Sequence, residues 1–223
     1  MQGYFVTGTD TGVGKTFVSE LLIYRLRGTH ARVAGFKPVA SGCVATPLGP
    51  RNADALTLQR ASSIELSYAQ VNPYAFAAPI APHLAAAEAG VTIDLDAIER
   101  AIVAVTADRV VVEGVGGWLA PLGTDIAVAD LARSLGLPVI LVVGMRLGCI
   151  NHALLSMESI RRYGLPVAGW VANSIDPGME RVDANISALR DRLDAPLLCD
   201  LPWCPNPVPE TLAADLFSGL RAR

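Results

Sequence analysis

The sequence predicts an α/β fold in which a mostly parallel sheet carries helices on both faces. Short apolar runs at residues 4–6, 109–113 and 138–143 are typical of buried strands. Stretches with helical spacing of apolar residues follow them, as at residues 17–26. Because strand and helix alternate along the chain, we expect parallel strands joined by right-handed crossovers.

The chain has 223 residues, of which 52% are apolar, so it can bury a sizeable core as one domain spanning residues 1–223. No internal repeat or domain boundary is visible. Further strands are predicted at residues 32–36, 167–172 and 196–199. Further helices are predicted at residues 54–60, 81–88, 95–107, 126–135, 149–163, 179–193 and 210–220. We expect turns at residues 46–52 and an ordered, proline-rich loop at residues 71–83.

A glycine-rich stretch joins the first strand to the first helix, and it reads Gly8-Thr9-Asp10-Thr11-Gly12-Val13-Gly14-Lys15-Thr16. The backbone N–H groups of such a loop point into one concavity, and the helix N-terminus adds positive potential, so phosphate binds there. Lys15 can reach the terminal phosphates of a nucleotide, and the Thr16 hydroxyl can hold Mg²⁺. A glycine turn without a ligand is the alternative. The strand–loop–helix context favours a P-loop that binds Mg·ATP. The spacing is unusual, because five residues, and not the usual four, separate the first glycine, Gly8, from the Gly14-Lys15 pair.

Polar residues also follow two other predicted strands. Lys37 and Ser41 come after residues 32–36, and Glu113 ends the run at 109–113 before a glycine-rich turn. Ligands bind at the carboxyl edge of a parallel sheet, so these side chains should face the P-loop crevice. A solvated lysine and a simple glycine turn are the alternatives. Asp54, at the start of a predicted helix, is either a helix cap or a Mg²⁺ ligand.

Charge and cysteine content exclude several classes of function. The net charge is −3 and no Lys/Arg run occurs, so we expect no nucleic-acid partner. The four cysteines form no CxxC pair, which disfavours zinc. The longest apolar run, residues 137–145, is shorter than the ~20 residues of a membrane span. With no signal-like segment before the first strand, we expect a cytoplasmic protein and no membrane partner.

Seven blocks of the sequence resemble the ATP-dependent dethiobiotin synthetase family of biotin biosynthesis. They are Tyr4–Thr16, Gly35–Gly42, Arg51–Leu56, Val71–Tyr74, Val111–Trp118, Leu147–His152 and Gly169–Asn173. The five-residue spacing in the P-loop is itself a feature of that family. The likeness is weaker at residues 177–193 and beyond Cys204.

The resemblance implies a reaction and its ligands. The family converts 7,8-diaminononanoate (7,8-diaminopelargonate), CO₂ and Mg·ATP to dethiobiotin, ADP and phosphate. One amine captures CO₂ as a carbamate, the carbamate attacks the γ-phosphate to give a carbamic–phosphoric anhydride, and the second amine closes the ureido ring.

The resemblance also implies roles for particular residues. Catalysis would fall to Thr11, Lys15, Lys37 and Ser41, of which Thr11, Lys37 and Ser41 also contact substrate, and Mg²⁺ would be held by Thr16, Asp54 and Glu113. Nucleotide contacts would come from Gly12, Val13, Gly14, Lys15, Thr16, Phe17, Asp54, Glu113, Gly114, Val115 and Gly116. The adenine pocket would contain Asn173, Ser174, Pro202, Trp203 and Cys204, with Glu210 near the nucleoside. Some relatives carry an acidic residue where this chain has Gly12, so any contact of that side chain is lost here.

The same family implies a homodimer in which the start of one helix reaches the partner's substrate. The residues concerned are Gly148, Cys149, Ile150 and Asn151, and the N–H groups at that helix start suit the substrate carboxylate. The alternative is a plain strand-to-helix turn with Arg146 solvated.

Two other classes of protein remain as alternatives, the first of them an interaction protein rather than a biosynthetic enzyme. A partition-type P-loop switch ATPase carries a signature lysine early in the loop, where this chain has Asp10. A cobyrinate-type amidation enzyme carries an added glutaminase domain, for which we expect this chain to be too short.

Overall fold

A computed structural model describes residues 1–205, 209–212 and 217. Its main sheet has six parallel strands in the order β10-β9-β8-β1-β7-β2, which confirms the predicted α/β class. The P-loop strand β1 pairs with β7 on one side and β8 on the other. The strands are β1 (Gly3–Gly8), β2 (Val33–Phe36), β7 (Arg109–Glu113), β8 (Val139–Met145), β9 (Val167–Ser174) and β10 (Leu197–Leu201).

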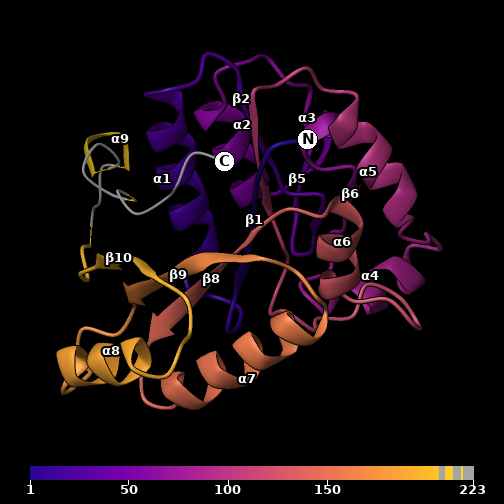
Figure 1. The fold of residues 1–223 in the computed structure, drawn as a ribbon. Coiled ribbons are helices and arrows are strands. Elements are labelled where there is room, and N and C mark those ends of the chain that lie inside the picture. Colours follow the sequence, from indigo (N-terminus) through magenta and orange to yellow (C-terminus); the bar gives the residue numbers. More distant parts are fainter. Residues whose placement is uncertain (206–208, 213–216, 218–223) are drawn as a thin grey trace.

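Helices lie on both faces of this sheet (Figure 1), as the sequence predicts. Side chains alternate between the faces along each strand, so Phe5 joins one core cluster and Val6 joins the other. The cluster containing Phe5 packs against α5 (Leu95–Val103), α6 (Val128–Leu135), α7 (Cys149–Arg162) and α8 (Val182–Arg190). The cluster containing Val6 packs against α1 (Lys15–Arg27) and the Leu58 and Ala61 side chains of α2 (Ala53–Ala61).

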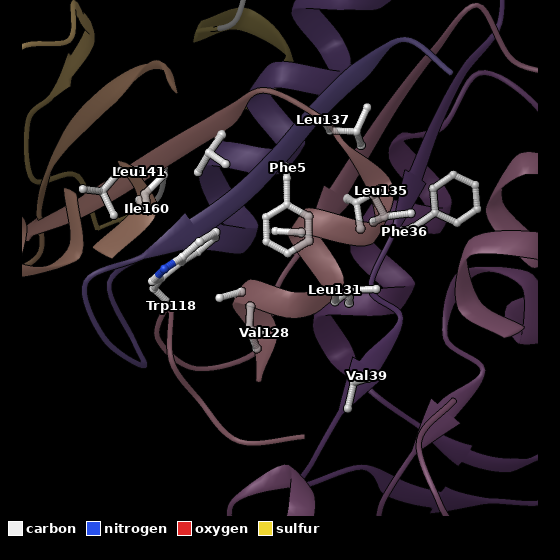
Figure 2. Packing of buried hydrophobic residues seen from close by; sticks show 14 of the residues in the cluster. Phe5, Phe36, Val39, Trp118, Val128, Leu131, Leu135, Leu137, Leu141 and Ile160 are labelled. Atoms are coloured by element: carbon white, nitrogen blue, oxygen red, sulfur yellow. The ribbon is translucent and has the colours of Figure 1, made fainter. Parts of the chain in front are cut away.

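The Phe5 ring occupies the centre of the first cluster, and Figure 2 shows it among Val128, Leu131 and Leu135 of α6. Each such fully buried side chain contributes about 1.5–3 kcal/mol of transfer free energy. Trp118, which follows the glycine turn after β7, packs edge-on against the Tyr163 ring at a centroid distance of 5.6 Å. This core therefore fixes the end of β7, where Glu113 lies.

Two small strand pairs flank the carboxyl edge of the main sheet. β3 (Val39–Ala40) runs parallel to β6 (Tyr74–Ala75), and β4 (Val44–Thr46) pairs antiparallel with β5 (Gly49–Arg51). Part of the segment predicted as turns is therefore a hairpin that reverses at Pro47 and Leu48, with Gly49 at φ 94°. Two short helices, α3 (Tyr68–Val71) and α4 (Pro82–Glu88), complete this region.

Several predicted boundaries were wrong. α5 ends at Val103 because the chain then turns toward Arg32, which binds Thr106 and Asp108 before β7 starts. β8 and β9 run further than predicted because they continue to pair up to Met145 and Ser174. The predicted helices at 126–135 and 179–193 are shorter, as α6 and α8. The helix predicted at 210–220 is described only as α9 (Pro209–Leu212). No helix in the described part of the chain is both long and apolar enough to cross a membrane.

Candidate active site

The P-loop connects β1 to α1, and its last glycine is required by the packing around it. Gly14 adopts φ 87°, and a Cβ atom there would lie 2.1 Å from Asn173 Nδ2. The same Asn173 amide donates a hydrogen bond to the Val13 carbonyl at 2.9 Å. In the part of the chain that is described, no side chain caps the N-terminus of α1, so its N–H groups remain available for an anion.

A cavity of about 790 Å³ opens beside this loop at the carboxyl edge of β1, β2 and β7. The P-loop contributes Thr11, Gly12, Gly14, Lys15 and Thr16, and the other predicted site residues on its wall are Lys37, Ser41, Asp54, Glu113, Val115 and Gly116. The wall also includes residues that sequence reasoning missed, namely Ala40, Asn52, Pro79, Ile80, Ala81, Pro82, Gly117, Ala120 and Pro121. The structure thus brings together residues from five separate segments, 11–16, 37–41, 52–54, 79–82 and 113–121.

Lys37 is the charged centre of the cavity floor. Its ammonium group lies 2.5 Å from Glu113 Oε1, 3.2 Å from Asp54 Oδ2 and 3.2 Å from the Gly114 carbonyl. Burial alone would lower the pKa of Lys37, but the two carboxylates outweigh it and raise that pKa above its ordinary value. Lys37 is therefore a buried, ion-paired lysine, not the solvated lysine of the alternative.

The pKa of Lys15 is shifted in the opposite direction to that of Lys37. Burial, and then the charge of the nearby Lys37, lower the pKa of Lys15 to about 8, against the opposing effect of Glu113 and Asp54. Its Nζ donates to the Asp10 carbonyl at 2.8 Å. The Asp10 carboxylate in turn pairs with Arg146, on the segment between β8 and α7. Arg146 is therefore ion-paired, unlike the solvated arginine of the alternative in which this segment is a plain strand-to-helix turn.

The two possible roles of Asp54 are separated by the geometry of α2. Asn52 is the N-cap, and its Oδ1 accepts a hydrogen bond from the Ala55 N–H at 3.2 Å. Asp54 lies in the first turn of α2, on the cavity wall and paired with Lys37. Asp54 is therefore not the helix cap.

The predicted Mg²⁺ ligands lie around the same lysine. Thr16 Oγ1 donates to Glu113 Oε1 at 2.9 Å, and the other oxygen, Glu113 Oε2, is buried without a hydrogen-bond partner among the described residues. An unpaired buried carboxylate oxygen is costly unless a cation or donor completes it. Among the described residues, no group of three or more His, Cys, Asp or Glu side chains could by itself hold a metal ion. The donor set fits Mg²⁺, which uses one or two carboxylates together with nucleotide phosphates and water.

Two hydroxyl groups face the cavity beside the lysines. Ser41 Oγ is buried and has no hydrogen-bond partner in the described structure, and Thr11 lies on the P-loop side. Both can donate to an anionic group in the cavity.

The predicted adenine-side residues lie outside this cavity. Asn173 and Ser174 end β9, and Pro202 to Cys204 directly follow β10 and are exposed. Leu201 is the register partner of Asn173, so these two segments end side by side next to the P-loop. The side chain of Val13 is buried in the core cluster that contains Val6, and Phe17 is partly buried against the same cluster. The side chain of Glu210 lies outside the described residues.

The start of α7 is also separate from the cavity. Gly148 precedes this helix at φ 94°, and a Cβ atom there would meet no described atom within 4 Å. Leu147 is 96% exposed and Asn151 is exposed, whereas Cys149 is buried and Ile150 is partly buried. The ion pair of Arg146 with Asp10 connects this helix start to the P-loop.

Comparison with known proteins identifies close relatives of this chain. A family model described as “AAA domain” matches residues 2–211. The chain is 54% identical over 205 residues, or 91% of this chain and 92% of the relative, to the ATP-dependent dethiobiotin synthetase BioD of Xanthomonas oryzae pv. oryzae strain PXO99A. It is 52% identical over 219 residues, or 97% of each chain, to the protein of the same name from Xylella fastidiosa strain 9a5c.

Solved structures show a more distant likeness. The MinC:MinD cell division protein complex of Aquifex aeolicus matches with a TM-score of 0.57 and 14% identity, over 92% of this chain and 83% of that chain. A ParA family ATPase from Chlorobium tepidum matches with a TM-score of 0.53 and 11% identity, over 92% and 86%. At these identities the likeness supports the P-loop NTPase fold alone.

Proposed function

Because the chain belongs to the family of ATP-dependent dethiobiotin synthetases, we propose that it converts 7,8-diaminononanoate, CO₂ and Mg·ATP to dethiobiotin, ADP and phosphate. The observation that carries this proposal is the pair of lysines, Lys15 and Lys37, on one cavity wall at a P-loop. The carbamate and the γ-phosphate are both anions, so their approach needs fixed positive charge between them.

The proposed reaction has three steps. One substrate amine attacks CO₂, forming a C–N bond and a carbamate while the amine loses a proton. A carbamate oxygen then attacks the γ-phosphorus, and the bond to the β-phosphate oxygen breaks to release ADP. The second amine attacks the carbamate carbon, closes the ureido ring with loss of a proton and expels phosphate.

The cavity residues have distinct tasks in this scheme. Ser41 and Thr11 donate hydrogen bonds to the carbamate, which would give Ser41 Oγ the partner that it lacks. Lys37 stays charged and stabilises the transferring phosphoryl group, whereas Lys15 binds the terminal phosphates. The backbone of Gly114 to Gly116 contacts the substrate amines or phosphate, and the backbone of Gly12 to Phe17 cradles the phosphates.

Mg²⁺ would be held by Thr16, Asp54 and Glu113 together with nucleotide oxygens and water, and it would neutralise charge on the β- and γ-phosphates. The adenine ring would lie beside the ends of β9 and β10, where Asn173, Ser174 and Pro202 to Cys204 meet. Glu210 is proposed to contact the nucleoside.

We further propose one domain and a homodimer. Two exposed apolar side chains lie on this part of the surface, Leu147 just before α7 at 96% exposure and Leu155 midway along α7 at 58%. Burial of such side chains between two copies of the chain would give a two-fold interface. Gly148 to Asn151 of one subunit would then bind the carboxylate of the diamine held by the other. The cytoplasmic location stays a prediction.

The experiment is product formation by purified protein. Incubation with Mg·ATP, bicarbonate and the diamine should give dethiobiotin by mass spectrometry, with ADP formed in equal amount. ADP release should require both the diamine and bicarbonate. ATP hydrolysis without any ureido product would contradict the proposal and favour a switch ATPase.

A further inference from the structure

The block Val71–Tyr74 has no role in the scheme above, and the structure joins it to Arg51–Leu56, the block that contains Asp54. Tyr68 connects Arg51–Leu56 to Val71–Tyr74 through hydrogen bonds to Asn52 and Asn72. We propose that Tyr68 and Asn72 are positioning residues that align the Lys37 ammonium with Asp54. This inference deepens the proposed function and rests on it.

The connection is a continuous chain of hydrogen bonds. The backbone N–H of Asn52 donates to the Tyr68 hydroxyl at 2.8 Å, and this hydroxyl donates to Asn72 Oδ1 at 2.7 Å. Asn72 Nδ2 then donates to the Lys37 carbonyl at 2.6 Å. One phenol and one amide therefore link the N-cap residue of α2 to the backbone of the buried lysine.

The side chains close this chain into a ring. Asn52 caps α2, and Asp54 lies two residues later in the first turn. Asp54 Oδ2 reaches back to Lys37 Nζ at 3.2 Å. The backbone of Lys37 and its ammonium group are thus both tied to the start of α2, so the Lys37–Asp54 geometry depends on both ties.

The surroundings hold the two linking residues in place. Asn72 is 2% exposed, and its backbone N–H donates to the Tyr68 carbonyl at 2.8 Å. The Arg51 guanidinium lies 4.2 Å from the centroid of the Tyr68 ring, a cation–π contact that fixes the ring independently of its hydroxyl. A Tyr68→Phe change therefore removes the hydroxyl and keeps the ring.

Backbone pairing extends the same alignment toward Ser41. The Lys37 N–H donates to the Val71 carbonyl at 2.9 Å, and the Phe76 N–H donates to the Ala40 carbonyl at 2.8 Å. Residues 71–76 thus hold residues 37–40 as a parallel pair, and Asn72 is the side chain that joins this pair to α2.

Tyr68→Phe is the primary test, and Tyr74→Phe is its matched control. The Tyr74 hydroxyl also accepts a backbone hydrogen bond, from Asp94 at 3.0 Å, but at α5. Loss of a residue that orients metal or substrate groups typically costs about 10–100-fold in affinity or activity. We expect Tyr68→Phe to lower kcat and raise the half-saturating Mg²⁺ concentration about tenfold, and Tyr74→Phe to change neither. Equal behaviour of the two variants would overturn the proposal.

A binding measurement separates this inference from the proposed reaction. Calorimetric titration with a non-hydrolysable ATP analogue, with and without Mg²⁺, gives the gain in affinity that Mg²⁺ provides. Tyr68→Phe should reduce this gain about tenfold and leave Mg²⁺-free binding unchanged. If the unmodified protein makes no dethiobiotin, the proposed function fails; an unreduced gain in Tyr68→Phe instead contradicts the positioning role.

The Asn72→Ala variant provides a second test of the proposed hydrogen-bond chain. Since Tyr68 acts through Asn72, the double variant should lose no more Mg²⁺-dependent affinity than Asn72→Ala alone. Thermal unfolding identifies any variant that fails to fold. If Asn72→Ala or the double variant does not fold, the comparison of Tyr68→Phe with Tyr74→Phe remains as the test. Additive losses would show that the two residues act separately and would contradict the proposed chain.

Discussion

The carboxylate of Asp10 in the P-loop forms an ion pair with the guanidinium of Arg146, 136 residues later in the chain. The carbonyl oxygen of the same Asp10 accepts the hydrogen bond from Lys15. One residue of the P-loop therefore contacts both Lys15, the proposed phosphate-binding lysine, and the segment that leads into α7. A substitution of Arg146 should therefore alter ATP binding.

We expect Arg146→Met to raise the KM for ATP about two- to fivefold with little change in kcat. The effect is modest because both side chains are nearly half exposed, and such pairs contribute about 0.2–1 kcal/mol. Arg161→Met, which removes a surface ion pair with Asp194, is the matched control. Steady-state kinetics on Asp10→Asn, Arg146→Met and the double variant would give the coupling, and strictly additive effects would show that the pair does not support ATP binding.

Lys37→Ala should lower both turnover and stability. Loss of a preorganised charge at the phosphoryl group typically costs about 10²–10³ in rate. The same change leaves the buried Glu113 carboxylate without its cation, and breaking a buried pair costs about 3–5 kcal/mol.

Adding Glu113→Gln to Lys37→Ala removes the unpaired charge, so the free energy of unfolding should recover while turnover stays low. Chemical denaturation and single-turnover assays measure the two effects. Arg161→Ala serves as the surface control, and near-normal turnover of Lys37→Ala would show that Lys37 is not catalytic.

The pH dependence of ATP binding should reflect Lys15. Its pKa is lowered to about 8 in the free protein, so the ammonium loses its charge as the pH rises through that value. We expect kcat/KM for ATP to fall up to tenfold per pH unit above about 8. Bound phosphate favours the charged form, so kcat itself should fall only at higher pH, and ATP binding near pH 8.5 should take up a proton.

Lys15→Arg provides the control for this profile. An arginine keeps its charge throughout the range because its pKa exceeds about 12, so the fall above pH 8 should disappear whatever the absolute activity. Calorimetry in buffers of different ionisation enthalpy measures the proton uptake. An unchanged profile in Lys15→Arg would assign the titration to another group.

Asp54→Asn should weaken Mg²⁺-dependent binding of a non-hydrolysable ATP analogue about tenfold. Asp54 is 42% exposed at its side chain, so this substitution should change the melting temperature little. Asp96→Asn is a suitable control because Asp96 is also an acidic residue in the first turn of a helix, α5. Equal Mg²⁺ dependence in both variants would mean that Asp54 orients Lys37 without contacting the metal.

Leu147→Glu should disrupt the proposed dimer without unfolding the subunit, because Leu147 is 96% exposed. Sedimentation should then show monomers, and the KM for the diamine should rise at least several-fold. Leu48→Glu, at an 80% exposed position on the β4–β5 hairpin, is the control. Leu147→Glu is preferable to Gly148→Val as a test, because a valine at the positive φ of residue 148 would strain the backbone. A fully active monomer would exclude a contribution from the second subunit.

The parts of the site that follow strand ends could be predicted from the sequence. Lys37 directly follows β2, Glu113 ends β7, and Lys15 begins the helix after the P-loop that follows β1. Parallel strands bring such positions to one edge of the sheet. The role of Asp54 could not be decided, because Asn52 and Asp54 both suit an N-cap and only the fold selects one. The sequence pattern likewise signals neither the Asp10–Arg146 pair nor the link from Tyr68 to Asn72. The first depends on how two segments 136 residues apart pack, and the second on the side-chain orientations within one short turn of helix.

The strand order has a consequence for how this site is assembled during synthesis. β7 lies between β1 and β2, and the only other described neighbour of β1 in the main sheet is β8. A nascent chain that ends before Arg109 therefore holds the P-loop and Lys37 on two strands that have no partner in that sheet. Glu113, the buried one of the two carboxylates that pair with Lys37, arrives on the strand that joins them. Sheet formation and neutralisation of the buried lysine should accordingly occur in one step, when β7 inserts.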